Sequence, residues 1–478
     1  MKKIVISKLF LYRYRFIIGY VLLGAAFIAL LLVLPAFSQH GLSAAEMEST
    51  TNSYALSATS PLSGDLVNLP YKALQKLSIS IFGLTPYAIK LPSIIIGLLL
   101  GLLLILLLNR WFKSNVSLLA STLIILSTPF LFLAGSGTPL IMIVFWPTLL
   151  LWLGSKIQGE KRPKPSYSLL FALALIFAVF TPYMIYFAIF CVLFVIFQPH
   201  LRFVVKNLPR LPLILVGIVI LGAFVALGMN IVSHPDTIME LLFVKGYNIS
   251  TFWQNLIDGF SPLFAWGSTF EGVLLTPLVS LPAFALVLIG LFSTTRGFFA
   301  SRNSIASVLL LFTAVITGFN PDAAVFIILP LSILTAHGLK YILEKWYGLF
   351  PENPYARIAA ILPLTALFAL IIIPSLLQYV YGYRYSPSVA TQFSYDLNII
   401  RENLTDETLL VRENYDFYKI LERSTDITVI PDTDRLSYEK LAILHGQDDS
   451  DKYTLSKIIT SPMTEESDII YIYTAKGE

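Results

Sequence analysis

Several charged side chains in the first half of the chain could carry out acid–base chemistry. Glu46 and Glu48 lie in the segment GLSAAEMES, just after an apolar run over 17–37. A carboxylate at a water–lipid boundary can act as a general base on an acceptor hydroxyl. The lysines that could offset the charge of a phosphate leaving group are Lys72, Lys76 and Lys245. The structural alternative is that both glutamates are solvated residues that cap a helix.

Long apolar segments must position these residues. Of the 478 residues, 56% are hydrophobic and 13% are charged, whereas a soluble domain carries roughly 25% charged residues. A membrane span needs about 20 mostly apolar residues. The sequence predicts about eleven spans, at 16–37, 88–108, 116–134, 139–154, 167–181, 183–198, 211–230, 273–293, 304–319, 322–340 and 358–378. We therefore expect an α-helical polytopic membrane protein, in which Pro182 breaks the fifth and sixth spans into a hairpin.

The charges of the loops predict the orientation of these spans. The segment 1–15 has five basic and no acidic residues, and Lys and Arg collect in cytoplasmic loops. With a cytoplasmic N-terminus, 19 of the 23 basic residues before Val380 fall in cytoplasmic loops. A cleaved signal peptide is the rival interpretation of the first span, although its apolar run is longer than such peptides carry. We expect a multi-pass protein of a bacterial plasma (inner) membrane.

Most acidic residues of the membrane part then fall on the extracytoplasmic side. Two long outside loops are predicted, at about 38–87 and 231–272, and the stretch YKALQKLSISIF in the first could lie along the membrane surface. The outside residues that we select as substrate-binding candidates are Glu48, Lys72, Lys76, Asp236, Lys245 and Asp322. Glu46 is the candidate catalytic base. No metal ligands are predicted, and a divalent ion beside Glu46 is left as an alternative.

The residues from 381 to 478 differ from the preceding 380. From Val380 to Glu478 there are 10 basic and 18 acidic residues, a net charge of −8. DETLLVRE, DITVIPDT and DIIYIYTA are typical of strands, and SVATQFSYDLNIIRENL and YDFYKILERS are typical of helices. We expect a small, soluble, extracytoplasmic α/β domain at 381–478, after a transmembrane domain at 1–380. The scattered basic residues of the membrane part do not indicate nucleic-acid binding.

The predicted spans carry no ionisable residue at their centres. His337 comes nearest and lies toward the cytoplasmic end of its span. Coupled transporters carry ionisable groups at the midplane, where coupling occurs. The sequence therefore argues against an ion-coupled carrier, although a lipid flippase needs less coupling chemistry.

Several segments, in this order, resemble the GT-C glycosyltransferases, which include protein mannosyltransferases and the aminoarabinose transferases of lipid A. The resemblance covers most of 1–345 and is carried by AAEMESTTNSYAL, NLPYKALQKLSISIFG, LTPYAIKLPSIIIG, LLASTLIILSTPFLFLAGSGTPLIMIVFW and PDAAVFIILPLSILTAHGL. It implies the GT-C fold and a polyprenyl-phosphate-linked sugar as the donor. In that family an acidic pair opens the first outside loop. Here the first acidic position falls on Ala45, an acidic position of the second outside turn on Leu140, and a basic position of the late span near Ala323 or Ala324.

The resemblance and the residues together predict an inverting glycosyltransferase. A sugar would move from a polyprenyl-phosphate carrier in the membrane to an extracytoplasmic acceptor, which could be a lipid, a glycan or a protein. Glu46 would accept the proton of the acceptor hydroxyl, and Lys72 or Lys245 would stabilise the departing phosphate. Two alternatives stay open: a catalytically silent GT-C protein that acts as a scaffold or binds lipid-linked glycans, and a lipid flippase or transporter.

Overall fold

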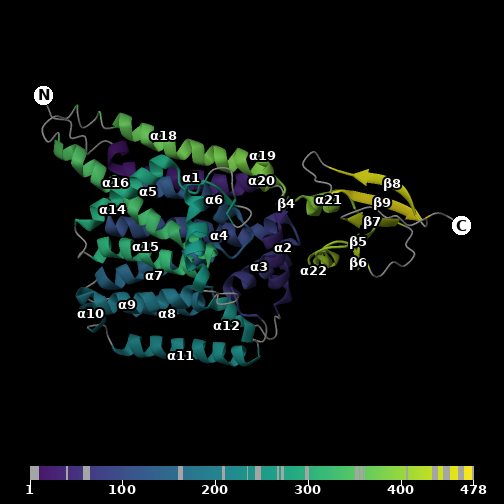
Figure 1. Cartoon of the computed structure of the whole chain (residues 1–478), viewed down its shortest axis with the longest axis horizontal. Coiled ribbons are helices and arrows are strands. Elements are labelled where there is room, and N and C mark those ends of the chain that lie inside the picture. Colours follow the sequence, from purple (N-terminus) through teal and green to yellow (C-terminus); the bar gives the residue numbers. More distant parts are fainter. Residues whose placement is uncertain are drawn as a thin grey trace.

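The computed structural model describes most of the chain. The described residues are 10–38, 41–56, 65–159, 165–206, 210–233, 235–242, 249–265, 269–270, 274–296, 301–349, 355, 359, 361–404, 407–432, 440–444, 453–460 and 468–475. Figure 1 shows a body of long helices that run roughly alongside one another, with a small sheet-containing unit at one end. The described part of the chain ends in this sheet, and its first helix begins at the opposite end of the molecule.

A helix lies within each of the eleven predicted spans. These helices are α1 (Phe10–Ser38), α4 (Pro86–Trp111), α5 (Ser114–Ile125) with α6 (Thr128–Gly135), α7 (Ile141–Gly159), α8 (Pro165–Val179), α9 (Met184–Phe197), α11 (Arg210–Ser233), α14 (Leu281–Thr295), α15 (Ser301–Phe319), η4 (Pro321–Ile327) with α16 (Ile328–Leu349), and α18 (Ile361–Leu377). The expected break at Pro182 separates α8 from α9. Whether all eleven helices span the membrane stays a prediction.

Length and composition identify part of this set as membrane helices. Within the described residues, six helical segments are long and apolar enough to cross a membrane. The α5–α6 pair, bent by 64°, gives a seventh if it counts as one span. Its second helix begins at Thr128–Pro129, and proline at a helix start cannot continue the hydrogen bonding of the helix before it. α8, α9 and α14 are apolar but shorter.

The outward faces of these helices are apolar. Only 17% of the α1 segment and 6% of the α18 segment are buried inside the protein. Ile17, Val21 and Leu22 of α1 are each more than 60% exposed. A water-soluble monomer rarely exposes apolar patches that run the length of a helix. The protein is therefore a multi-pass membrane protein.

Two glycines allow α14 and α16 to pack with their backbones in contact. A Cβ atom on Gly290 of α14 would lie 2.0 Å from the carbonyl oxygen of Leu334. A Cβ atom on Gly338 of α16 would lie 2.1 Å from the carbonyl oxygen of Leu286. Small residues at helix crossings permit this close approach within membranes.

Replacement of Gly290 by alanine should therefore destabilise the helical body. The added methyl group must push α14 away from α16, and overpacking of this kind costs about 1–3 kcal/mol. Thermal unfolding in detergent should give a lower midpoint for Gly290→Ala than for the wild type. Gly228→Ala is the matched control, because a Cβ atom there meets no atom within 4 Å. Equal midpoints for the two variants would contradict the prediction.

Shorter elements follow or connect the long helices, and Figure 1 shows α2, α3 and α12 of this set at the end of the body that faces the sheet. They are α2 (Ala44–Ala55), α3 (Leu69–Phe82), α12 (Pro235–Leu241), α13 (Phe252–Phe260) and the small hairpin β2 (Thr269–Phe270) and β3 (Leu274–Leu275). The stretch predicted as amphipathic forms α3. Its exposed face carries Leu74, Leu77 and Ile81, whereas Gln75 and Ser78 are buried. An apolar outer face fits a helix on the membrane surface, and that placement stays a prediction.

The C-terminal unit contains a five-stranded mixed sheet. Its strands are β5 (Thr408–Val411), β6 (Thr428–Pro431), β7 (Lys440–Leu444), β8 (Tyr453–Ile459) and β9 (Ile470–Ala475). The order is β6-β5-β7-β9-β8, with β6, β5 and β7 parallel and the other two antiparallel to their neighbours. Helices α21 (Asp396–Asn403) and α22 (Tyr415–Tyr418) belong to the same unit. The sequence predicted β5, β6, β9 and these helices, but neither β7 nor β8.

A short strand pair connects this unit to the membrane part. β1 (Leu42–Ser43) pairs antiparallel with β4 (Phe393–Ser394). Gly41 is needed beside this pair, because a Cβ atom there would lie 2.1 Å from the carbonyl oxygen of Ser394. The last apolar helix continues through η5 (Gln378–Gly382) and α19 (Tyr383–Tyr385). The domain boundary expected at 380/381 lies inside this helical run and stays a prediction.

Candidate functional site

Helix α2 carries both candidate glutamates and is fixed at its start by a capping box. The Ser43 side chain accepts a hydrogen bond from the backbone N–H of Glu46, and the Glu46 carboxylate accepts one from the backbone N–H of Ser43. This reciprocal pair satisfies two backbone donors that a helix start leaves unpaired. It sets the rotation of α2, and therefore which side chains turn inward.

Glu46 turns inward and is 1% exposed. Its carboxylate accepts hydrogen bonds from the backbone N–H groups of Gly137 at 2.6 Å and Ser43 at 2.9 Å. The Lys90 ammonium, also buried, lies 3.8 Å from the same carboxylate and donates to the carbonyl of Gly41 at 3.1 Å. A buried carboxylate must be paired and hydrogen-bonded in this way. Glu46 thus ties α2 to α4 and to the turn between α6 and α7.

A buried glutamine makes a second connection beneath α2. The Gln75 side-chain amide donates to the carbonyl groups of Gly137 at 2.9 Å and Ile89 at 3.1 Å. Its oxygen accepts hydrogen bonds from Ser49 at 2.9 Å and Ser53 at 2.6 Å. Four elements are therefore joined by one fully hydrogen-bonded side chain, an arrangement that fixes a unique geometry.

Tyr71 of α3 extends this polar layer. Its hydroxyl is hydrogen-bonded to the Ser93 hydroxyl at 2.7 Å, and Ser93 in turn donates to the carbonyl of Thr138 at 3.2 Å. Burial, and to a smaller extent the Glu46 carboxylate, raises the pKa of Tyr71 above its ordinary value. The hydroxyl thus stays protonated. Glu46, Gln75, Tyr71 and Ser93 thus form a hydrogen-bonded layer at this end of the helical body, which we call the polar floor.

A cavity of about 320 Å³ lies above this floor. Four carboxylate residues from four separate segments and one lysine line it: Glu48, Asp65, Lys72, Glu240 and Asp322. The other lining residues that the argument uses are Ala45, Ser49, Asn52, Leu140 and Tyr183. Ala45, Glu48, Ser49 and Asn52 are spaced i, i+3, i+4 and i+7 and so share one face of α2. Glu46 lies on the opposite, buried face.

Lys72 is the basic side chain among the residues that line this cavity. It is 8% exposed, and its ammonium forms an ion pair with the Asp65 carboxylate. Asp65 also accepts a hydrogen bond from the backbone N–H of Val67 at 2.9 Å, which holds its loop at the start of α3. An ammonium has three donors, so Lys72 can bind an anionic oxygen in addition to Asp65.

Two other predicted site residues, Lys76 and Asp236, lie away from the cavity. Lys76 donates to the carbonyl groups of Tyr54 and Leu56 and so caps the C-terminus of α2. Asp236 is exposed on α12 and does not line the cavity, and Lys245 lies outside the described residues. In the described part of the chain, no group of three or more His, Cys, Asp or Glu side chains could hold a metal ion.

Three of the residues predicted to bind substrate therefore meet at the cavity, namely Glu48, Lys72 and Asp322. The sequence placed Asp65 and Glu240 on the same side of the membrane but did not select them as site residues. The available signal was their position in the two long outside loops. Loop residues converge through tertiary packing, so sequence spacing did not distinguish them from Asp236.

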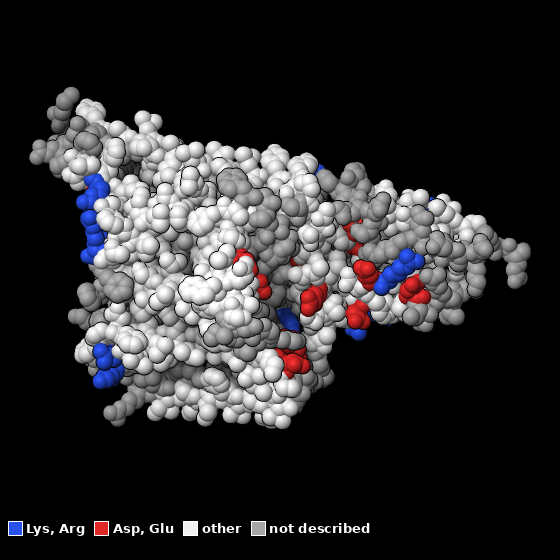
Figure 2. All heavy atoms as spheres, in the orientation of Figure 1, with Lys and Arg blue, Asp and Glu red and all other residues white. Residues whose placement is uncertain are grey.

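The surface charges separate along the molecule. Figure 2 shows Lys and Arg at the end of the helical body that is remote from the sheet. Asp and Glu gather around a hollow where the body meets the C-terminal unit, and on that unit itself. The acidic cavity thus lies at the end of the body opposite the basic loops.

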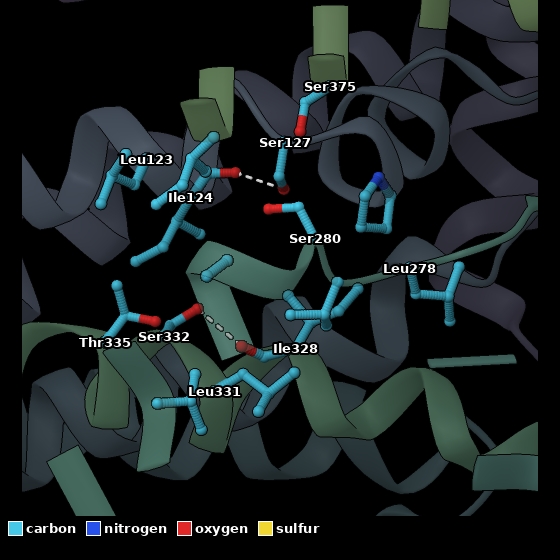
Figure 3. Close-up of a pocket in the computed structure, with 15 residues that line it drawn as sticks. Leu123, Ile124, Ser127, Leu278, Ser280, Ile328, Leu331, Ser332, Thr335 and Ser375 are labelled. Carbon is cyan, nitrogen blue, oxygen red and sulfur yellow. Dashed lines mark hydrogen bonds between the residues drawn. The ribbon is translucent and has the colours of Figure 1, made fainter. Parts of the chain in front are cut away.

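A second, smaller cavity of about 80 Å³ lies within the apolar body (Figure 3). It is enclosed by the α5–α6 bend, α14, α16 and α18, with Ser127, Ser280, Ser332 and Thr335 among mostly aliphatic walls. Ser127 donates to the carbonyl of Ile124 at the end of α5, and Ser332 donates to the carbonyl of Ile328 in α16, as the dashed lines show. No charged side chain lines this cavity, so the acidic cavity is the better candidate for chemistry.

Comparison with known proteins identifies the fold. ArnT from Cupriavidus metallidurans, solved with bound undecaprenyl phosphate, matches with a TM-score of 0.55 and 14% identity, over 95% of this chain and 98% of that one. The oligosaccharyltransferase AglB from Archaeoglobus fulgidus, solved with an inhibitory peptide and a dolichol-phosphate, matches with a TM-score of 0.54 and 13% identity. That match covers 88% of this chain but only 65% of AglB. No curated protein matches the sequence.

These likenesses define the class: the chain is a multi-pass membrane protein with the GT-C fold of lipid-linked sugar transferases. Within it, residues 69–229 match the family model described as dolichyl-phosphate-mannose-protein mannosyltransferase. The matched segment contributes Lys72, Leu140 and Tyr183 to the cavity, whereas Glu48 and Asp322 lie outside it. The resemblance noted from the sequence is thus confirmed.

Proposed function

We propose that the protein transfers a sugar from a polyprenyl-phosphate carrier to an extracytoplasmic acceptor at the acidic cavity. The observation that carries this proposal is the convergence of Glu48, Asp322 and Lys72 on one cavity at the end of an apolar body. Such a site can receive a donor whose lipid tail stays in the membrane while its phosphate and sugar reach water. The GT-C fold, which ArnT shares in a complex with undecaprenyl phosphate, supports this assignment.

Glu48 is the better base in this proposal, although the sequence favoured Glu46. A general base must come within hydrogen-bond reach of the proton that it accepts. Glu46 is buried and its carboxylate is engaged by Gly137 and Ser43, whereas Glu48 is exposed in the cavity. The role predicted for Glu46 has not been tested, and its position favours a structural role instead.

The proposed reaction is an inverting displacement. Glu48 accepts the proton of the acceptor hydroxyl while the hydroxyl oxygen attacks the anomeric carbon of the sugar. The bond from this carbon to the phosphate oxygen breaks, and the carrier leaves as a polyprenyl phosphate. Lys72 stabilises the negative charge that develops on this phosphate. The fold and the two residues support these steps.

The proposed orientation places the cavity outside the cytoplasm. Basic residues favour the cytoplasmic side of a membrane, and they gather at the end of the body away from the cavity (Figure 2). The N-terminus would then be cytoplasmic and the C-terminal unit extracytoplasmic. β1 and β4 connect this unit to the start of α2, so it is placed to contribute to acceptor binding.

Lys72 gives a test of donor binding. Replacement by methionine should weaken binding of a polyprenyl phosphate by about tenfold to a hundredfold, because a hydrogen bond to a charged group contributes about 1.5–3 kcal/mol. Equilibrium binding of the radiolabelled lipid to purified protein measures this change. Lys72→Arg should retain most of the affinity. Lys76→Met is the control, since Lys76 caps α2 rather than lining the cavity; equal losses in both methionine variants would contradict the proposal.

A turnover assay tests the proposed function as a whole. The purified protein in lipid is incubated with a panel of radiolabelled polyprenyl-phosphate sugars and with lipid, glycan and peptide acceptors. We expect transfer, or slow hydrolysis of one donor, that is lost in Glu48→Gln. Consumption of no donor under any of these conditions would contradict the enzymatic proposal.

A second candidate function rests on two cavity residues. Ala45 and Leu140 line the cavity at positions where the resemblance to GT-C enzymes leads us to expect acidic residues. A protein that binds lipid-linked sugars without transferring them would retain Lys72 but could lack these acids. Tight, saturable binding of a donor without turnover would favour this function. Turnover that depends on Glu48 would exclude it.

A further inference from the structure

A third cavity, of about 290 Å³, lies at the opposite end of the helical body from the acidic cavity. It is enclosed by the C-terminal parts of α4, α7 and α9 and the N-terminal parts of α8 and α15. Its walls are Trp111, Leu150, Leu151, Gly154, Ser155, Gln158, Phe171, Phe190, Cys191, Phe194, Val195, Arg302 and Ile305. Since two helices begin and three end here, the cavity opens toward one membrane surface.

The walls divide into an apolar and a polar part. Leu150, Phe171 and Phe190 lie about one turn or more from the helix ends, whereas Gln158 and Arg302 lie at the ends. Protein interiors are close-packed and leave few voids larger than a water molecule. An apolar void of this size, next to lipid, has the dimensions and surroundings of a site for a hydrocarbon chain.

Arg302 supplies the polar part with a fixed positive charge. Its Nη1 donates to the carbonyl oxygen of Trp111 at 2.6 Å, and its guanidinium lies 5.4 Å from the ring centroid of Phe112. These contacts hold the group at the rim of the cavity. A guanidinium carries five N–H donors in a planar fork, so Arg302 can bind phosphate oxygens while it keeps its contact with Trp111.

Further basic residues lie at this end of the body. The helix termini at this end of the body carry Arg110, Lys113, Lys156 and Arg302, and Figure 2 shows positive charge concentrated there. Basic pockets between transmembrane helices bind the headgroups of anionic lipids, because each nearby Lys or Arg attracts the negative headgroup. The positive charge at the rim and the apolar interior of the cavity therefore both fit an anionic lipid.

We propose that this cavity binds one anionic phospholipid from the leaflet at the basic end of the protein. One acyl chain lies between α7, α8 and α9, against Leu151, Phe171 and Phe194. The phosphate lies at Arg302, where the side-chain amide of Gln158 offers further N–H donors. This site is separate from the acidic cavity and does not depend on the proposed transferase activity.

Gly154 allows the cavity to be filled without disturbing its walls. A Cβ atom on Gly154 meets no atom within 4 Å, and the residue lines the cavity. Gly154→Leu should therefore occupy the space of the acyl chain. Gly217→Leu is the matched control, because Gly217 of α11 has the same open surroundings but lies away from the cavity.

Native mass spectrometry of the full-length, delipidated protein tests the proposal. The protein is titrated with phosphatidylglycerol and with phosphatidylcholine of identical acyl chains. We expect one phosphatidylglycerol to bind more tightly than phosphatidylcholine in the wild type and in Gly217→Leu, and this binding to be lost in Gly154→Leu. Arg302→Gln should weaken phosphatidylglycerol binding by about fivefold, the effect of one basic residue near an anionic lipid. It should weaken phosphatidylcholine binding less, because the choline cation already balances the phosphate of that lipid.

Two results would overturn the proposal. Equal binding of the two lipids to the wild type would show that the cavity does not select an anionic headgroup. Unchanged binding of phosphatidylglycerol to Gly154→Leu would place the lipid elsewhere. If Gly154→Leu does not fold, Arg302→Gln still tests the proposal. An unchanged preference for phosphatidylglycerol in Arg302→Gln would show that this arginine does not bind the headgroup.

Discussion

Replacement of Glu48 by glutamine is expected to lower the rate of sugar transfer by about 10²- to 10⁴-fold, the usual contribution of a positioned general base. Glutamine keeps the size and polarity of the side chain but cannot accept the acceptor's proton. Because Glu48 is exposed in the cavity and forms no part of the polar floor, folding and donor affinity should stay close to those of the wild type. Initial rates at saturating donor, with thermal unfolding alongside, measure both effects.

Asp236→Asn is the matched control for this experiment. Asp236 is also an exposed acidic residue on the same side of the protein, but it lies on α12 and outside the cavity lining. Its replacement should leave the rate unchanged. A rate for Glu48→Gln within about threefold of the wild type, a difference of less than 1 kcal/mol in the barrier, would rule out Glu48 as the base.

Replacement of Glu46 by alanine is expected to lower the free energy of unfolding by about 3–5 kcal/mol, the usual cost of removing one partner of a buried ion pair. The change leaves the Lys90 ammonium buried without its carboxylate, and the backbone N–H groups of Gly137 and Ser43 without their acceptor. The α6–α7 turn would then lose its direct hydrogen bond to α2 and keep only the connection through Gln75. Unfolding midpoints in detergent measure the loss, and rates are compared per folded molecule.

The double variant Glu46→Ala/Lys90→Met distinguishes a structural from a catalytic role. Because it removes the unpaired lysine charge along with the carboxylate, it should recover part of the stability lost in Glu46→Ala. A structural Glu46 also predicts that Glu46→Gln, which keeps one oxygen acceptor, retains measurable transfer. Complete loss of transfer in Glu46→Gln, with unfolding like that of the wild type, would instead return the role of base to Glu46.

The sequence alone was sufficient to predict a multi-pass helical membrane protein and the class of fold. Apolar runs of about 20 residues predict membrane helices directly, because within lipid the backbone can satisfy its hydrogen bonds only in helices or closed barrels. The break at Pro182 was predicted from local chemistry, since proline lacks the N–H that a helix needs. The 64° bend at Pro129 has the same cause, but it was not predicted, because 116–134 was taken as one span. Strands β7 and β8 were missed because β-structure depends on neighbouring strands more than on local preference.

Only the tertiary structure decided which charged residues meet at the candidate site. Glu46 and Glu48 are two positions apart, so they point to different faces of α2, but the sequence does not say which face is buried. The hydrogen bond from Gly137, 91 residues further along the chain, settles this. Asp65, Glu240 and Asp322 join Glu48 because loops from distant segments end at one surface. Helix positions follow from local polarity and backbone chemistry, whereas a site that is assembled across the fold follows from packing.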